Sequence, residues 1–181
     1  MPESPDPMSP AAPTSRPLGM GLVAVIGLLA APIVVALVSS LTAAGLPTGD
    51  FAIIEMGALD VPSHLPLVGV YSRFGFHHPG PVIFYLAALP VRVFGPHGLA
   101  VTATVVNVAA VAGLVVTLHR RGGQLLVVLG AAMALLVIHA LGADVVSIWN
   151  PYLPVLALAV AVALTWSVWE RDWWCLPWLA A

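Results

Sequence analysis

The chain has 181 residues, of which 60% are hydrophobic and only 8% are charged. A soluble domain carries about 25% charged residues, so a chain with a mean hydropathy of +1.02 cannot cover a water-facing surface and is interpreted as an integral membrane protein. The formal net charge of -2 suggests no nucleic-acid partner, and the single cysteine, Cys175, excludes an intramolecular disulfide and a cysteine metal cluster.

The N-terminal part combines a proline-rich segment with a long uncharged run. Residues 1–17 contain few large apolar side chains, so this segment is predicted to be a disordered tail. The run Leu18–Leu46 has no charged residue and exceeds the roughly 20 residues that span a bilayer. The apolar core of a cleaved signal peptide would be about 7–15 residues long after a basic start, whereas only Arg16 precedes this longer run. An uncleaved first span is therefore favoured.

The first loop, residues 47–79, concentrates ionisable groups in a chain that is otherwise poor in charge. If its beginning is helical, Asp50 and Glu55 point about 140° apart, because each helical residue turns by about 100°. Pro62 and Pro66 prevent such a helix from extending far. The mixture predicts a short helix on the membrane surface, with a solvated loop as the alternative. Long loops in compact proteins are often functional. The ionisable residues are Asp50, Glu55, Asp60, His64, Arg73, His77 and His78.

Several further apolar runs follow the first loop. Gly80–Phe94 is so short that it barely crosses the hydrocarbon unless flanking residues extend it. The sequence predicts an all-α fold, a polytopic transmembrane helical bundle of about five spans plus the start of a sixth. This transmembrane module would cover residues 18–181. The other complete runs are Leu99–Leu118, Gln124–Leu141 and Tyr152–Trp169, separated by breaks at Gly95–Gly98, His119–Gly123 and Gly142–Pro151.

The C-terminal run Trp173–Ala181 is too short to complete a span. The chain is therefore interpreted as the N-terminal part of a longer membrane protein or as a truncated relative. Tryptophans are clustered around residue 170, and tryptophan prefers the membrane interface. This cluster predicts an interfacial belt, and a platform on which a sugar stacks is the alternative.

Arginine positions leave the membrane orientation open. If every run crosses and the N-terminus is cytoplasmic, only Arg16 and Arg92 lie inside and most of the arginines lie outside. This distribution contradicts the positive-inside rule, and an external N-terminus would reverse it. A third arrangement also satisfies the rule. If Gly80–Phe94 does not fully cross, Arg16, Arg120, Arg121 and Arg171 lie inside, and the first loop shares the outer face with residues 147–151.

The end of the first loop has groups suited to phosphate. In "SRFGFHHPGPVIFY", Arg73, His77 and His78 come just before a turn that opens the next apolar run. Cations at this depth can bind phosphate, and a carboxylate opposite them could take a proton from a hydroxyl. A divalent metal held by the two histidines would need further ligands such as His64 or Asp60. No metal ligand is assigned, and no cofactor is firmly expected.

These residues resemble a known family. A span ending in "GD", an acid a few residues later, and then "PLVGVYSRFGFHHPGPVIFYLAALPVRVFG" are similar to the N-terminal module of GT-C superfamily membrane glycosyltransferases. The likeness is nearest to actinobacterial multi-spanning proteins of this type, and the layout is shared by lipid A aminoarabinose transferases and protein mannosyltransferases. It covers most of the chain from about residue 18, and "SIWNPYLP", residues 147–154, also resembles these relatives.

The resemblance implies a site and a reaction. Asp50 would be the catalytic base, Glu55 the second acid of the motif, and His78 the basic residue that meets the donor phosphate. A polyprenyl-phosphate sugar would donate its sugar to an acceptor hydroxyl on the extracytoplasmic side of the cell membrane. The expected substrate-binding residues are Arg73, His77, His78, Trp149 and Asn150. A module that lacks the remaining spans and a C-terminal partner or domain would be inactive alone.

Two other classes of function stay open. A transporter component would use buried charges and broken helices near the bilayer midplane, whereas the polar groups of this chain lie at the ends of its apolar runs. A non-catalytic membrane scaffold needs no chemically dense loop. All three interpretations place the chain in the cell membrane as a multi-pass protein whose partners include membrane lipids.

Overall fold

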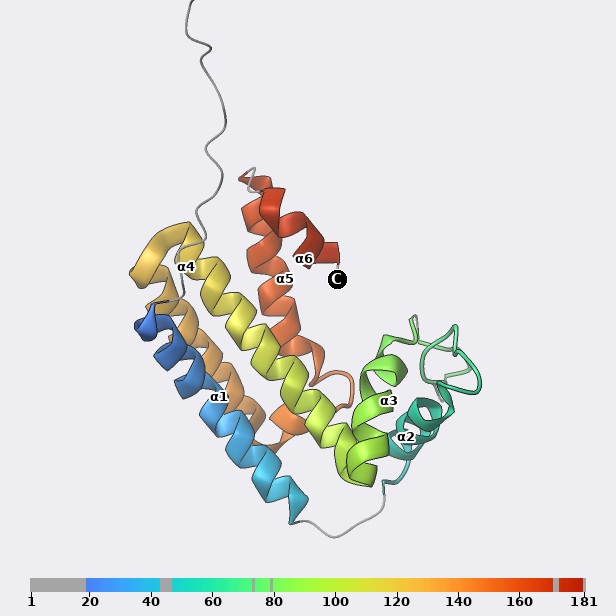
Figure 1. Cartoon of the computed structure of the whole chain (residues 1–181). Helices are drawn as coiled ribbons and strands as arrows, with labels where there is room; N and C mark the ends of the chain where they lie inside the picture. Colours follow the sequence, from blue (N-terminus) through green and yellow to red (C-terminus); the bar gives the residue numbers. More distant parts are fainter. Residues whose placement is uncertain (1–18, 43–46, 73, 79, 171–172, 181) are drawn as a thin grey trace, which may run out of the picture.

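The computed structural model describes residues 19–42, 47–72, 74–78, 80–170 and 173–180 (Figure 1). The described part is all-helical, and no strand occurs in it, as the sequence predicted. The predicted tail, residues 1–17, lies outside the described residues. Long apolar runs favour this architecture, because a helix satisfies its own backbone hydrogen bonds.

Three helices form a bundle. These are α1 (Met20–Leu41), α4 (Gly98–Leu141) and α5 (Pro154–Trp169). Helix α4 is bent at Gly122 and Gly123, where the backbone leaves helical geometry. Gly123 has φ +62°, which a residue without Cβ adopts readily. The two limbs, residues 98–121 and 124–141, therefore run in opposite directions (Figure 1).

The bundle has one continuous apolar core. Buried side chains of α1, of both limbs of α4 and of α5 pack together, along with residues of the short 3-10 helix η2 (Gly142–Val146) that follows α4. The sequence runs predicted for the first span and for the two limbs correspond closely to these helices. The core consists of Leu29, Ile33, Ala110, Val111, Leu114, Val115, Val127, Ala134, Ile138, Val145, Val146, Leu156 and Ala163.

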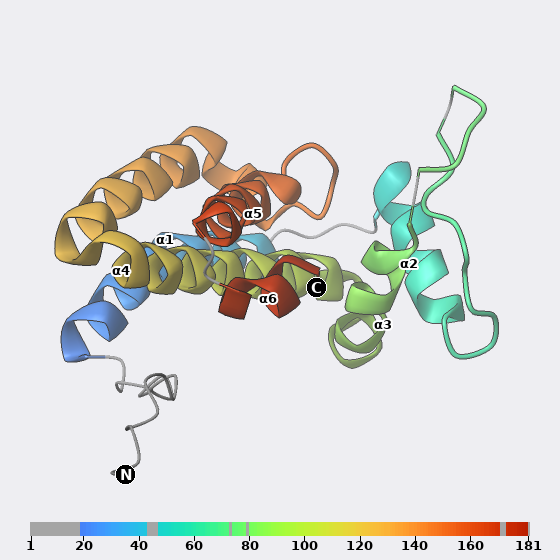
Figure 2. The same cartoon turned by 90° about the horizontal axis from the view of Figure 1, so that it is seen from above.

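A second unit, here called the arm, lies beside one end of the bundle (Figure 2). It contains α2 (Asp50–Asp60), α3 (Val82–Phe94) and, between them, the hydrogen-bonded segments 69–72 and 74–78, here called the hairpin. The 3-10 helix η1 (Gly95–His97) joins α3 to α4. The arm has its own apolar core, to which the bundle contributes residues from the beginning of α4 and from the loop after η2. This core contains Ile54, Ala58, Ala87, Val91, Leu99, Ala103 and Ile148.

Helix lengths bear directly on the predicted membrane spans. Two stretches are long and apolar enough to cross a membrane by length and composition, namely Met20–Leu41 and the bent stretch Val82–Val146. Helix α3 has 13 residues and would rise about 20 Å, less than the roughly 30 Å of hydrocarbon. Helix α5 is apolar but has only 16 residues. The number of about five spans therefore stays a prediction.

The chain after α5 turns back along it. Its described part comprises the 3-10 helix η3 (Trp173–Cys175) and the short helix α6 (Leu176–Ala180). This segment lies at the end of the bundle where α4 bends, and Arg120 stacks there on Trp174. The arm and the α4 bend thus mark opposite ends of the bundle (Figure 1).

Candidate functional site

Asp50 and Trp149 meet at the end of the bundle that carries the arm. Asp50 is the first residue of α2, and its Oδ2 accepts a hydrogen bond from Nε1 of Trp149 at 3.0 Å. The two residues are 99 positions apart in the sequence. An indole N–H can only donate, so this bond orients the carboxylate and leaves its other oxygen available. Asp50 is exposed, which keeps that oxygen accessible from outside the protein.

The loop that carries Trp149 is fixed by local and distant contacts. The hydroxyl of Ser147 accepts the backbone N–H of Trp149 at 3.3 Å, and the Tyr152 ring meets the indole edge to face at 5.7 Å between centroids. Ile148 is buried in the core of the arm. These contacts tie the loop to α2 and leave the indole directed at Asp50.

The preceding turn is tied to α4. Asn107, which is 1% exposed, donates its side-chain N–H to the Val145 carbonyl at 2.7 Å. This bond joins η2 to the first limb of α4 across 38 positions of sequence. Because η2 leads directly into the loop, contacts with the bundle as well as with the arm fix the position of Trp149.

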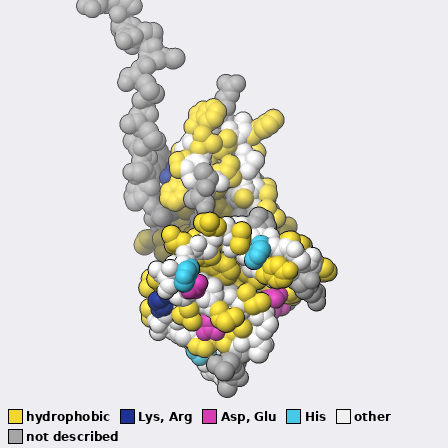
Figure 3. All heavy atoms as spheres, turned by 90° about the vertical axis from the view of Figure 1, so that its right-hand side faces the viewer, with side chains coloured by type: hydrophobic (Ala, Val, Ile, Leu, Met, Phe, Trp, Pro, Cys, Tyr) yellow, Lys and Arg dark blue, Asp and Glu magenta, His cyan; other side chains and the backbone are white. Residues whose placement is uncertain are grey.

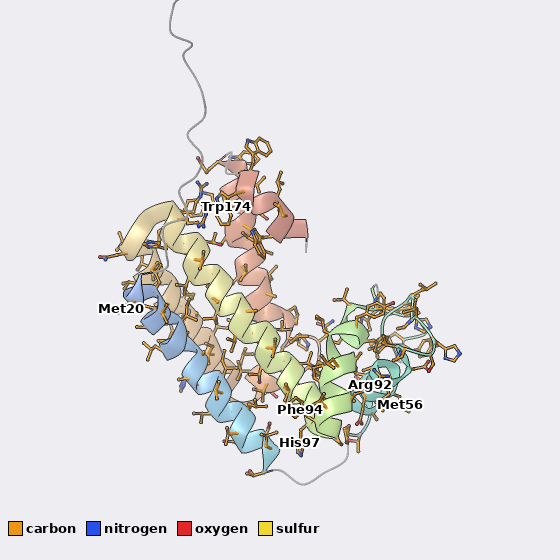
Figure 4. The ribbon with its side chains drawn as sticks, in the orientation of Figure 1. Met20, Met56, Arg92, Phe94, His97 and Trp174 are labelled. Atoms are coloured by element: carbon orange, nitrogen blue, oxygen red, sulfur yellow. The ribbon has the colours of Figure 1, made fainter. Side chains whose placement is uncertain are left out.

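Helix α2 is held against α3 at two places. A Cβ at Gly57 would lie 2.5 Å from a ring carbon of Phe84, so a larger residue would have to displace this ring. Near the end of α2, the guanidinium of Arg92 donates to the Leu59 carbonyl, and it also donates to the Ala88 carbonyl at 3.2 Å. A cation at a helix C-terminus is favourable there because the last carbonyls lack helical partners. Arg92 therefore fixes the end of α2 remote from Asp50 (Figure 4).

The histidines of the first loop lie in the hairpin. His77 pairs with Tyr71 in an isolated β-bridge, and their rings meet edge to face at 5.0 Å. His77 Nδ1 lies 3.1 Å from the Gly69 carbonyl, which can only accept, so Nδ1 carries the proton and Nε2 stays available. The backbone N–H of His78 donates to the Val70 carbonyl at 2.9 Å.

Figure 3 shows the outer face of the arm, where acidic, basic and histidine side chains lie among hydrophobic ones. Exposed aromatic and aliphatic residues follow the loop and the hairpin. The loop is also tied to α3, because the Tyr85 hydroxyl donates to the Pro66 carbonyl at 2.6 Å. The strongly exposed apolar residues here include Met56, Leu65, Leu67 and Phe74.

The structure joins some of the predicted site residues and leaves others apart. Asp50 and Trp149 are bonded, and Asn150 follows Trp149 as an exposed residue of the same loop. Glu55 is half-buried on α2 and makes no hydrogen bond or ion pair with another described residue. Within the described ranges, no hydrogen bond or ion pair links the two predicted histidines, His77 and His78, to Asp50. Arg73 lies outside the described residues.

A divalent metal held by the two histidines of the hairpin would need further ligands such as His64 or Asp60, and the structure shows where these lie. His64 Nδ1 and Asp60 Oδ1 lie 3.1 Å apart, one turn from each other at the end of α2, and are bonded to one another. Among the residues that the structure describes, no group of three or more His, Cys, Asp or Glu side chains is placed to hold a metal ion. No hydrogen bond or ion pair links His64 or Asp60 to His77 or His78 among the described residues.

Two residues that position the site were not singled out in the sequence. Arg92 is an isolated charge in an apolar run, and such a charge requires a partner, so this signal could have drawn attention to it. Asn107 is a lone amide within the run Leu99–Leu118, which is the same kind of signal. In both cases the sequence could indicate that a partner exists but not that it is a carbonyl far along the chain.

Comparison with known proteins adds no further constraint to this geometry. No family model matches the sequence, and neither the curated proteins nor the solved structures contain a match.

Proposed function

We propose that this chain is a multi-pass membrane module of a GT-C-like glycosyltransferase, with Asp50 as the catalytic base. The observation that carries the proposal is the 3.0 Å hydrogen bond from Trp149 Nε1 to Asp50 Oδ2. It brings together the acid of the first loop and the "SIWNP" stretch, which were both assigned to the site from the sequence. Two motifs so far apart in a helical chain meet only if the fold assembles them at one end.

The proposed topology has four crossings: α1, the two limbs of α4, and α5. Helix α3 stays at the Asp50 end, since about 20 Å of helix is too short to cross and α3 lies beside only one end of the bundle (Figure 1). Helix α5 would rise about 24 Å, which flanking residues or local thinning of the bilayer can accommodate.

Arginine positions then support one orientation. Arg120 and Arg121 lie at the α4 bend, and Arg16 and Arg171 adjoin the ends of α1 and α5 on that side in the sequence. Arg92 belongs to the arm at the other end. The positive-inside rule places the α4 bend in the cytoplasm and Asp50 outside. Lipid-linked sugar donors are used on that outer side in the family that the sequence resembles.

The proposed reaction needs a base and a site for the leaving phosphate. The carboxylate of Asp50 accepts the proton of the acceptor hydroxyl. At the same time, the oxygen of this hydroxyl bonds to the anomeric carbon of the donor. The bond from this carbon to the polyprenyl phosphate breaks at the same time, and the phosphate leaves with the electron pair. His77, His78 and the sequence-assigned Arg73 offset its charge. The hydrogen bond from Trp149 supports this role for Asp50 by fixing one carboxylate oxygen.

Sugar transfer tests the role of Asp50 in membranes that contain this module together with the remaining spans and the C-terminal partner or domain. Asp50→Asn should lower the rate of transfer from a labelled polyprenyl-phosphate sugar by about 100-fold or more, because the amide cannot act as base. Asp60→Asn is the matched control, since Asp60 lies on the same helix but is bonded to His64. Transfer should persist in this control. An undiminished rate in Asp50→Asn would remove the proposed base.

Sidedness is the second test. Ser63→Cys places a thiol in the first loop, and the native Cys175 is buried, so a membrane-impermeant thiol reagent should label intact cells at position 63. The unaltered chain controls for labelling of Cys175. Labelling only after permeabilisation would put Asp50 in the cytoplasm and end the proposal. Substrate uptake into sealed vesicles without sugar transfer would then favour a transporter component.

A further inference from the structure

The end of the bundle opposite Asp50 carries two arginines on tryptophan rings. The guanidinium carbon of Arg120 lies 4.4 Å from the ring centroid of Trp174, and that of Arg121 lies 5.2 Å from the ring of Trp166. Both arginines belong to the α4 bend, whereas both tryptophans belong to α5 and the segment that follows it. Trp174 lies far from Phe94 and His97, which mark the arm end (Figure 4).

The two guanidinium groups differ in what they bind. Arg121 donates to the carbonyls of Trp166 and Ser167, at 3.4 and 3.2 Å, and so closes the last turn of α5. Arg120 is exposed, and its guanidinium makes no hydrogen bond to another residue in the described part of the chain. Stacking uses the face of a guanidinium and leaves its N–H groups, which lie in the plane, free to donate. Arg120 is therefore an oriented donor group without a protein acceptor among these residues.

The surroundings of Arg120 match the depth of lipid headgroups. Tryptophan side chains prefer the membrane interface, and several at this end are strongly exposed. The planar fork of a guanidinium binds a phosphate through two parallel hydrogen bonds. His119, next to Arg120 in the sequence, and Glu170, next to the end of α5, are also exposed, so the charges of this segment are not uniformly basic and suit one phosphate better than an extended polyanion. The exposed tryptophans are Trp169 (84%), Trp173 (63%) and Trp178 (67%).

We propose that Arg120, oriented by Trp174, binds the phosphate of an anionic phospholipid headgroup at the α4 bend. This site lies at the opposite end of the bundle from Asp50 and does not depend on sugar transfer. Anionic lipid is favoured over zwitterionic lipid because its phosphate charge is not balanced by a cation in the same headgroup. The stacked ring holds the guanidinium in place before binding, so less side-chain entropy is lost when the phosphate arrives.

Lipid binding by the purified full chain in detergent tests this site. The probes are phosphatidylglycerol, phosphatidylcholine and inorganic phosphate, with bound lipid measured by native mass spectrometry. Arg120→Gln should weaken phosphatidylglycerol binding by about tenfold, as expected for a charge-assisted hydrogen bond that is lost. Arg120→Lys keeps the charge but not the planar fork, so it should give a smaller loss. Trp174→Leu should weaken binding in the same direction.

The control is Trp178→Leu, which removes an exposed tryptophan without changing the stacked pair and should bind phosphatidylglycerol as the unaltered chain does. Thermal unfolding of each variant separates lost binding from lost folding, and Arg120→Lys decides the question if Arg120→Gln does not fold. Unchanged binding by Arg120→Gln, or equal binding of phosphatidylcholine, would overturn the proposal. Displacement of phosphatidylglycerol by inorganic phosphate of similar affinity would reduce the site to one for free anions and would also overturn it.

Discussion

The bundle and the arm are held together in different ways. In the bundle, α1, α4 and α5 share one continuous apolar core. The arm has a smaller core and depends on a few directional or close contacts. These are the glycine contacts of α2 and α4 with α3, the link from Arg92 to Leu59, and the bond from Trp149 to Asp50.

The two regions should respond differently to substitutions. Apolar packing is spread over many side chains, so the loss of one contact leaves most of it intact. A directional contact has one geometry and one partner, and its loss changes the position of a whole helix. The candidate site lies in the arm, where position depends on single residues. Substitutions in the arm should therefore alter the site more than comparable substitutions in the bundle.

The largest effect is expected at Gly98, where the arm joins α4. A Cβ at this position would lie 2.4 Å from backbone atoms of Pro90 and Val91, which cannot move without displacing α3. Gly98→Ala should therefore lower the free energy of unfolding by about 3 kcal/mol, at the upper end of overpacking costs. Thermal unfolding in detergent, followed by tryptophan fluorescence, measures it.

Gly27→Ala is the matched substitution in the bundle. Gly27 lies in α1, and no atom lies within 4 Å of the Cβ it would gain. Because alanine is the better helix former, stability should stay the same or rise slightly. Equal melting temperatures for Gly98→Ala and the unaltered chain would show that the junction tolerates displacement, and the contrast between the two regions would be wrong.

A smaller effect is expected at Arg92. Arg92→Gln removes charge-assisted donors from the carbonyls of Leu59 and Ala88, and because Arg92 is exposed the cost should be about 1 kcal/mol. Amide hydrogen exchange should increase in the last turn of α2. Arg121→Gln, which removes a guanidinium from carbonyls at the far end of the bundle, should leave exchange in α2 unchanged. Faster exchange in α2 for Arg121→Gln, with unchanged exchange for Arg92→Gln, would show that Arg92 does not hold the end of α2.

Much of the bundle could be predicted from the sequence because its signals are local. Uncharged apolar runs predicted the helices, and the glycine pair at 122–123 predicted the end of one run and the start of the next. The short helix after Gly49 was also predicted, from its mixed character and from the prolines at 62 and 66, and it is present as α2. Such features depend only on residues that are neighbours in the chain.

The candidate site was less accessible to sequence reasoning. That Asp50 and Trp149 both belong to it came from a family resemblance, and no local pattern indicates that they touch across 99 positions. The same limit applies to Arg92, whose partner Leu59 offers only a carbonyl, a group that every residue has. Side-chain chemistry can be read from a sequence, but a backbone acceptor leaves no compositional signal.

The smallest effect is expected for the hydrogen bond between the exposed side chains of His64 and Asp60. Their nitrogen and oxygen atoms lie 3.1 Å apart, but the side chains are 81% and 56% exposed. Exposed pairs contribute little because water screens the attraction and ordering the side chains costs entropy. His64→Ala should therefore change the unfolding free energy by less than about 0.5 kcal/mol. Directional contacts in the arm then matter only where the partner is a backbone group or a fixed ring. A loss of unfolding free energy comparable to that of Arg92→Gln would contradict this conclusion. It would show that exposed pairs also hold the arm and that another group shields this pair from water.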